Sequence, residues 1–287
     1  MSSGISFSEH RITYQTTTNN NMSFMDQKIL RIKTETIMTN TCKNCDQHFN
    51  GNFCNTCGQT ANTHKINSHF LWHDIQHGLL HFDNGIFYTI KQLFTRPGHT
   101  IREFIDGKRI RHFKPLSLVI ILATIYGLLI HNFNIEFIPQ LERTRSPQEI
   151  NFYEKIKDWL TNHYSWATLI LLPFYAFGSF IAYKKQHRNF VEHLVLNAFL
   201  AGQRLILHII AFPLLYVYRD SSNLNVVTGL LTFMDFGLFF WGYSQFFNNI
   251  SKLKNFLLTL IASLIFVFSI MLVGILVGTS LALLITT

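Results

Sequence analysis

Charged side chains are scarce in this sequence. They make up 14% of its 287 residues, whereas an ordinary soluble domain carries about 25%. The shortage is greatest in residues 116–287, which hold most of the long apolar runs. An apolar run of about 18 residues or more predicts a transmembrane helix. The composition therefore excludes an ordinary soluble domain and predicts an all-α, multi-pass membrane protein.

Motifs of several enzyme classes are also missing. The sequence contains no nucleophile motif, no phosphate-binding loop and no H-E-x-x-H helix. It shows no signal peptide either, because Met1–Asn40 has no apolar core before a cleavage site. Residues 1–40 instead have the polar composition of a disordered leader. These absences favour a non-enzymatic protein.

Five apolar runs are long enough to cross a membrane. The expected spans are Leu116–His131, Ser165–Tyr183, Val191–Val217, Val226–Phe247 and Phe256–Ile285. Four or six spans are left open, since the first run is short and the last is long. The last run is nevertheless too short for two spans of about 20 residues each. We therefore expect a helical bundle over residues 116–287, with the lipid bilayer as its first partner.

Basic residues outnumber acidic ones by 24 to 16, and most lie beside the apolar spans. This distribution fits anionic lipids and the positive-inside bias better than nucleic-acid binding. The alternation of basic segments predicts a cytoplasmic N-terminus and an outside C-terminus. A basic patch before the first span either sets this orientation or binds a phosphate or anionic headgroup. It consists of Lys108, Arg109, Arg111 and Lys114.

Cysteine is rare, and all four cysteines fall within 16 residues. Their order is C-x2-C, eight residues, then C-x2-C-G, which suits four thiolates around one Zn2+. Asn50-Gly51 supplies a turn signal between the two pairs. Two disulfides are the alternative, but they need an oxidising compartment. We predict a structural zinc ribbon over residues 41–60, ligated by Cys42, Cys45, Cys54 and Cys57.

Four histidines recur at intervals of four residues: His69, His73, His77 and His81. On a helix they would share one side, with apolar residues on the other. Such a helix lies in the membrane interface, and residues 66–115 are expected to hold interfacial helices and the basic segment. The alternative is a second metal site, because histidines four residues apart can chelate a transition metal.

A short turn and helix precede the first span. In Arg96-Pro97-Gly98 the proline presets φ and the glycine permits the left-handed region, which predicts a turn. Thr100 and Glu103 have the spacing of a capping box. We therefore expect a helix over Ile101–Asp106, ended by Gly107.

The third span and its start carry several polar side chains: Glu192, His193, Asn197, Gln203, Arg204 and His208. Ionisable groups inside a membrane are costly and usually face a bundle interior or a cavity. Asp235 in the fourth span lies at a depth comparable with Arg204, so we predict that these two pair. The polar stripe is either interhelical bonding, helped by Gly274 and Gly278, or a conduit.

The region from the cysteine pairs to the first span resembles a bacterial membrane family, domain of unknown function 3667. The resemblance covers residues 42–131 and implies a cytoplasmic-membrane protein with an N-terminal zinc ribbon. It implies no established activity. It rests on His81-Phe82-Asp83-x-Gly85, Arg96-Pro97-Gly98, Ile101–Phe104, Gly107-Lys108-Arg109 and Phe113-Lys114-Pro115, with a later match at Phe190–Val195.

These patterns together predict a non-enzymatic membrane scaffold or adaptor. Its zinc ribbon would engage a cytosolic protein partner or regulate the bundle. The first alternative is a transporter for a small solute or metal ion that uses the polar stripe. The second is a membrane-embedded metal-dependent enzyme, supported by Glu192-His193 and the histidine series. A homo-oligomer is left open.

Overall fold

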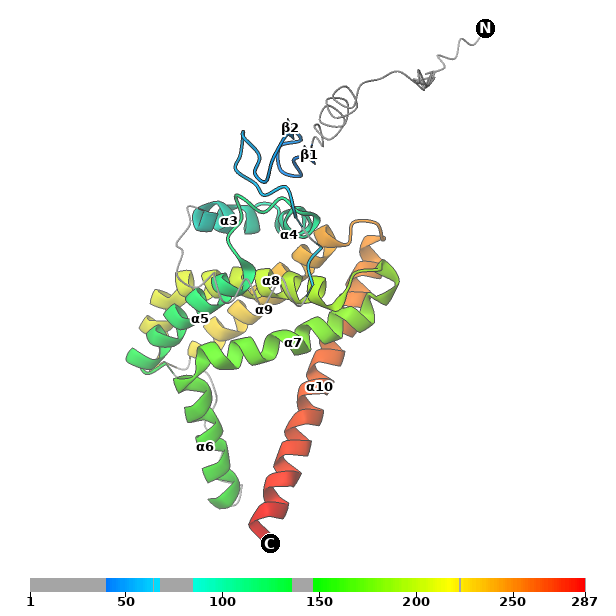
Figure 1. Cartoon of the computed structure of the whole chain (residues 1–287). Coiled ribbons are helices and arrows are strands. Elements are labelled where there is room, and N and C mark those ends of the chain that lie inside the picture. The colour runs from blue at the N-terminus through cyan, green and yellow to red at the C-terminus, as the bar shows by residue number, and fades with distance from the viewer. Residues whose placement is uncertain (1–39, 64, 68–84, 136–146, 222, 287) are drawn as a thin grey trace, which may run out of the picture.

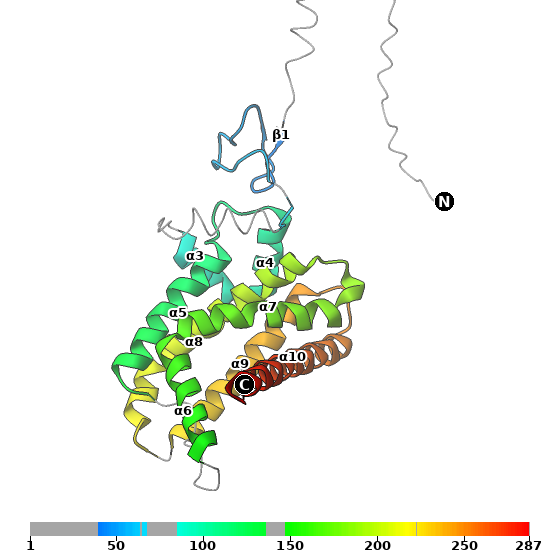
Figure 2. The ribbon, with the colours of Figure 1, turned by 60° about the horizontal axis from the view of Figure 1, so that its bottom comes forward.

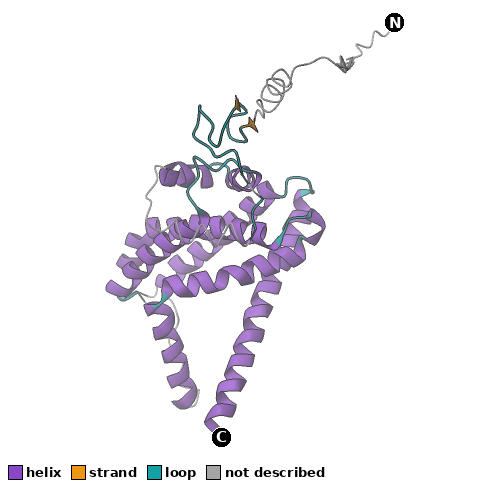
Figure 3. Ribbon diagram, in the orientation of Figure 1, coloured by secondary structure: helices purple, strands orange, loops and turns teal. Residues whose placement is uncertain are grey.

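The computed structural model describes residues 40–63, 65–67, 85–135, 147–221 and 223–286. Helices dominate these ranges, and strands occur only near their start (Figure 3). The predicted leader lies almost wholly outside the described residues. The four-histidine series falls within residues 68–84 and also lies outside them.

A small cysteine module, residues 40–63, forms one end of the molecule (Figure 1). Strand β1 (Asn40–Thr41) pairs antiparallel with β2 (His48–Phe49). A single bridge joins Phe53 to Thr60 further along. The module has its own small core, in which Phe49 packs with the cysteines. So small a core needs additional stabilisation, such as a bound metal.

Two short helices lie beneath the cysteine module: α3 (Gly85–Leu93) and α4 (Pro97–Asp106) (Figure 1). The predicted turn at Arg96-Pro97-Gly98 is misplaced: the chain turns at residues 94–96, because α4 already begins at Pro97. Proline is well suited to the first helical position, where its fixed φ matches the helix. Gly107 ends α4 in the left-handed conformation, with φ 116°, as predicted.

Five helices are long and apolar enough to cross a membrane, which confirms the predicted number among the described residues. The start of α8 is fixed by a capping box between Asn189 and Glu192. Glu192 therefore caps the helix and does not project into the membrane interior. The five are α5 (Pro115–Asn132), α7 (Tyr164–Ala182), α8 (Phe190–Tyr218), α9 (Leu224–Phe246) and α10 (Lys252–Thr286).

Two further elements lie in connections that the sequence analysis treated as loops. Helix α6 (Pro147–Asn162) precedes α7, and the short 3-10 helix η1 (Lys184–Gln186) follows it. The α6 sequence mixes charged and apolar residues, so its mean hydropathy is too low for a search for spans to find this helix. Both α6 and α10 extend away from the end that bears the cysteine module (Figure 1).

The main core lies where α5 and α8 pack together, with further buried side chains from α4, α7 and α9. Gly202 of α8 lets Leu118 of α5 approach closely, and Gly178 of α7 lies against the backbone of α10 at Ala262. The predicted contact at Gly274 and Gly278 is wrong within this chain, since no described atom lies near the position of a Cβ on either glycine. Small residues do bring helices together, but they do so at Gly178 and Gly202.

Helices α9 and α10 form the more exposed side of the bundle. In the most apolar windows of both helices 11% of residues are buried, against 50% for α5 and α8. Figure 2 views α10 almost along its axis and shows it at the edge of the assembly. The apolar side chains on this side are therefore available to lipid.

Candidate functional site

The four cysteines lie together at the tip of the molecule. Their sulfur atoms all lie within 4.8 Å of one another. The Sγ atoms of Cys42 and Cys57 are 3.5 Å apart, as are those of Cys45 and Cys54. Tetrahedral ligation at a Zn–S distance of about 2.3 Å places sulfurs about 3.8 Å apart. The four thiols are free, and their arrangement fits a four-coordinate metal ion.

The two cysteine pairs repeat one backbone pattern at an interval of 12 residues. In the first, the Cys42 N–H donates to Gln47 O, and the Cys42 carbonyl accepts from the Asp46 N–H, both at 2.9 Å. In the second, Cys54, Gly58 and Gln59 make the same two bonds, both at 2.8 Å. The residue after each pair has positive φ, which glycine adopts at no steric cost. Pairing therefore closes each knuckle on itself and does not run across the Asn50-Gly51 turn.

Backbone N–H groups point at the sulfur atoms of the module. Burial raises the pKa of Cys54, but hydrogen bonds from the N–H groups of Cys57 and Thr56 and from the Cys45 and Cys42 thiols together lower it to about 6. Burial also raises the pKa of Cys57, but hydrogen bonds from the Gln59 N–H, the Asn44 side chain and the Cys42 and Cys45 thiols together lower it. Such bonds stabilise the thiolate that a metal requires.

Gln59 connects the cysteine module to the segment after α4. Its side chain is 3% exposed. Its Nε2 donates to Gly107 O at 2.7 Å, and its Oε1 accepts from the Arg109 N–H at 3.1 Å and the Ile110 N–H at 3.4 Å. One buried amide therefore pairs with three backbone groups of the loop after α4. No pattern in the sequence marked this glutamine.

Two further contacts hold the module in place. Lys43 Nζ donates to Thr63 O at 2.9 Å, and its stem lies where a Cβ on Gly107 would be. Beyond the module, Ile66 is buried in the main core, and Asn189 Nδ2 donates to the Ile66 carbonyl at 3.1 Å. The module is thus joined both to α4 and to the start of α8.

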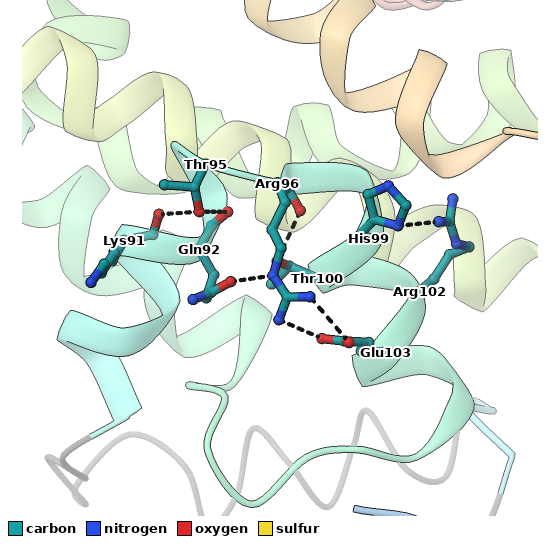
Figure 4. Close-up of polar contacts among 8 residues, drawn as sticks. All are labelled: Lys91, Gln92, Thr95, Arg96, His99, Thr100, Arg102 and Glu103. Carbon is teal, nitrogen blue, oxygen red and sulfur yellow. Dashed lines mark hydrogen bonds and ion pairs between the residues drawn. The ribbon is translucent and has the colours of Figure 1, made fainter.

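Arg96 organises the turn between α3 and α4 (Figure 4). Its guanidinium donates to Gln92 and, with both terminal nitrogens, to the Glu103 carboxylate at 3.1 and 3.3 Å. Thr100 donates to the Arg96 carbonyl at 2.9 Å. The predicted capping box is therefore wrong: Glu103 pairs with Arg96, because α4 starts earlier than the box requires.

The opposite side of α4 holds the end of α9. The Gly98 N–H donates to Gln245 Oε1 at 3.1 Å, and Arg102 donates to the carbonyls of Gln245 and Phe246. These carbonyls belong to the last turn of α9, where no N–H group of the same helix is left to pair with them. The positive charge of Arg102 also interacts favourably with the negative end of the α9 helix dipole. Arg102 contacts His99 as well (Figure 4).

The segment that contains α3 and α4 matches the model of a known sequence family. Residues 83–127 match the family model described as Protein of unknown function (DUF3667). We call residues 83–127 the DUF3667 segment. Comparisons with the curated proteins and with the solved structures found no match. In this structure the DUF3667 segment comprises α3, α4 and most of α5. Within it, Arg96 connects α3 to α4, and Gly98 and Arg102 connect α4 to α9.

The predicted basic patch lies in the loop that connects α4 to α5, within the DUF3667 segment. Arg109 Nε donates to Phe104 O at 3.1 Å, and its guanidinium lies 5.7 Å from the Phe104 ring centroid. Lys108 and Lys114 are half-buried, and Arg111 is exposed. Arg109 is thus engaged with Phe104 of α4, and headgroup binding by the patch stays a prediction.

Within the bundle, the predicted polar stripe separates into two clusters. In the first, Ser179 Oγ lies 2.9 Å from His193 Nδ1 and accepts from Asn197 Nδ2 at 3.0 Å. Tyr243 donates to Asn197 Oδ1 at 2.9 Å. Gln203 stands apart and donates to the Leu93 carbonyl at the end of α3. The cluster around Ser179 joins α7, α8 and α9. It includes Ser179 and Tyr243, which the sequence analysis did not select.

The second cluster corrects the predicted Arg204–Asp235 pair. Asp235 Oδ2 lies 2.9 Å from His208 Nε2, and the other ring nitrogen of His208 lies 3.2 Å from the Tyr126 hydroxyl. Arg204 contacts Tyr175 and attracts Asp235 only at longer range, without an ion pair between the two. Similar depth in the bilayer was not enough to identify the partner of Asp235. His208 lies one turn beyond Arg204 on α8, and its ring is the group in contact with the carboxylate.

A cavity of about 350 Å3 lies among α7, α8, α9 and α10. Asn197, Arg204 and Asp235 line it, so the structure brings these three predicted residues to one space. His193 and His208 are not among its lining residues. Most of the other lining side chains are apolar, including Leu172, Leu200, Phe236 and Phe239.

Proposed function

We propose that this chain is a non-enzymatic integral-membrane adaptor. A metal-bound cysteine module would be held rigidly against the membrane helices and would present its outer surface to a cytosolic protein. The observation that carries the proposal is the buried amide of Gln59, which joins the second cysteine knuckle to the loop after α4. A flexible tether would suffice for a module that only needed to be near the membrane.

The outer surface of the module suits a protein partner. Phe53 lies between the two knuckles and is 61% exposed, although it is large and apolar. Gln47, the counterpart of Gln59 in the first knuckle, is also exposed. One side of the module is therefore committed to the membrane helices, and the other is free to bind. We propose a bacterial cytoplasmic membrane location with the module inside, from the positive-inside bias.

We propose zinc as the metal. Four thiolates without an open position are typical of structural zinc sites. Purified protein should hold one zinc per chain by elemental analysis. Cys54→Ser should abolish binding, whereas replacing His69, His73, His77 and His81 with Gln should leave the zinc content unchanged. A second metal lost with the histidines would contradict the adaptor and favour metal transport or catalysis.

Photo-crosslinking in cells tests the adaptor role directly. A photoreactive residue at Phe53 should give a discrete protein adduct, and the adduct should disappear in the Cys54→Ser background. The same residue at Phe87, which is exposed on α3, serves as a control and should give lipid adducts. Protein adducts at Phe53 that do not depend on Cys54, or lipid adducts alone, would contradict the proposal.

A small-solute transporter is the second candidate, because the cavity reaches Arg204 and Asp235. A conduit requires water on both sides of this cavity. Thr232→Cys, located by peptide mass spectrometry, should react with a water-soluble thiol reagent from both membrane faces if the protein transports. Protection from both faces would leave the adaptor as the better account.

A further inference from the structure

The cavity among α7–α10 offers few hydrogen-bonding groups to a ligand. The hydroxyls of Thr168, Thr232 and Ser263 each donate to a carbonyl one turn earlier in their own helix. The Asn197 amide is engaged with Ser179, His193 and Tyr243. A polar solute would therefore find most of the wall either apolar or already bonded.

The two charged groups of the cavity, Arg204 and Asp235, have hydrogen-bonding capacity left. Arg204 carries five N–H donors, more than its contact with Tyr175 uses. The Asp235 Oδ1 atom is buried without a hydrogen-bond partner in the described structure, while Oδ2 contacts His208. A buried acceptor without a partner costs about 1–3 kcal/mol. A ligand that both accepts from Arg204 and donates to Asp235 would remove this cost.

The charges of the cavity select an uncharged head group. Arg204 and Asp235 contribute one cation and one carboxylate to the same lining. A phosphate would gain from the first but be repelled by the second. A neutral group with a carbonyl and a hydroxyl meets both without leaving a net charge in the membrane.

The cavity reaches the lipid-facing surface between α9 and α10. Phe236 and Val267 line it and are 54% and 50% exposed. They lie on the two helices of the bundle that are least buried. A hydrocarbon chain could therefore leave the cavity directly into the bilayer. The apolar wall of the cavity would cover the part of the chain nearest the head group. Pockets of about 300–1,000 Å3 are typical of ligand sites.

We propose that this cavity binds the head group of an uncharged single-chain lipid of the monoacylglycerol class. The ester carbonyl accepts from Arg204, the glycerol hydroxyl donates to Asp235 Oδ1, and the acyl chain leaves between α9 and α10. This site is separate from the cysteine module, and the proposed adaptor role does not depend on it.

The test uses the full chain in detergent with 1-oleoylglycerol as the probe and native mass spectrometry as the measurement. Val267→Trp should block the mouth of the cavity, and Leu264→Trp is its matched control. Leu264 lies one turn earlier on α10, is 61% exposed and does not line the cavity. Asp235→Asn tests the head-group contact while keeping the side-chain size. Melting temperatures check that each variant is folded.

We expect one 1-oleoylglycerol per chain in the wild-type protein and in Leu264→Trp. Binding should be at least tenfold weaker in Val267→Trp and in Asp235→Asn, since about 1.4 kcal/mol corresponds to a factor of ten. Equal binding in the two tryptophan variants, or no binding to the wild-type protein, would overturn the site. Tighter binding of oleic acid or oleoyl lysophosphatidic acid than of 1-oleoylglycerol would overturn the head-group assignment.

Discussion

Asp235 is a carboxylate in a membrane-spanning helix with one close partner, His208. Because they are 2.9 Å apart and the carboxylate has little else to bind, the two should be energetically coupled. A double-mutant cycle with His208→Ala and Asp235→Ala should give a coupling of about 1 kcal/mol in detergent-solubilised protein. The control cycle of Asp235→Ala with Ser179→Ala, which belongs to the other cluster, should be additive. Additive losses in the His208 cycle would contradict the pair.

His112 should make stability depend on pH. It is buried outside the membrane-spanning helices, and burial lowers its pKa to about 4. The unfolded chain, with a pKa near 6.5, binds more protons between these values, so acid favours unfolding. Stability should therefore be full above about pH 6.5 and fall by about 3 kcal/mol as the pH drops to 4.

His112→Phe provides the control for that titration. The substitution keeps an aromatic ring against Tyr88 and Phe104, whose rings contact His112 edge-on. Unfolding midpoints of both proteins across this pH range isolate the histidine from the carboxylates that also titrate. Parallel profiles for the wild-type and variant proteins would rule out the assigned role.

At this scale, sequence predicted the residues whose chemistry is local. The four cysteines could be selected because their spacing alone is typical of a metal site, and the structure brings their sulfurs together. Gln59 could not be selected, since a glutamine becomes special only when it is buried against backbone groups about 50 residues away. The partner of Asp235 was missed because depth along a helix does not determine which side chain reaches it.

Gly98 decides how closely α4 approaches α9. A Cβ at this position would collide with the backbone of Gln245 and Phe246. Gly98→Ala should therefore lower stability by about 1–3 kcal/mol through overpacking, seen as a lower melting temperature in detergent.

Gly237→Ala is the matched control for Gly98→Ala. Gly237 lies within α9 and has no other atom within 4 Å of a Cβ position. Alanine there should leave stability unchanged or raise it by up to about 1 kcal/mol, since glycine is the poorer helix former. A loss at Gly237 as large as at Gly98 would show that the contact with α9 is not the cause.

Among the elements, long apolar helices were the easiest to predict. All five spans follow from hydropathy to within a few residues of the helices, because the bilayer imposes both length and composition. The start of α4 was misplaced because proline is compatible both with a turn and with the first turn of a helix. Helix α6 was missed because its mixed composition carries no span signal.

Over the whole molecule, the DUF3667 segment connects the cysteine module with the membrane helices. The module contacts the loop after α4, and α4 contacts the end of α9. A change in the module therefore has a contiguous structural path to the bundle, by way of two short helices. Sequence could predict both ends of this path but not their connection, which depends on contacts between residues far apart in the chain.

Hydrogen exchange in the loop after α4 tests the central claim most directly. The N–H groups of Arg109 and Ile110 donate to Gln59 Oε1, so their exchange reports whether the module is held in place. Peptides covering residues 107–112 should be protected in zinc-loaded protein and in Gln47→Ala. They should lose protection when zinc is chelated and in Gln59→Ala. Protection that survives both zinc removal and Gln59→Ala would contradict a metal-bound module held by this glutamine.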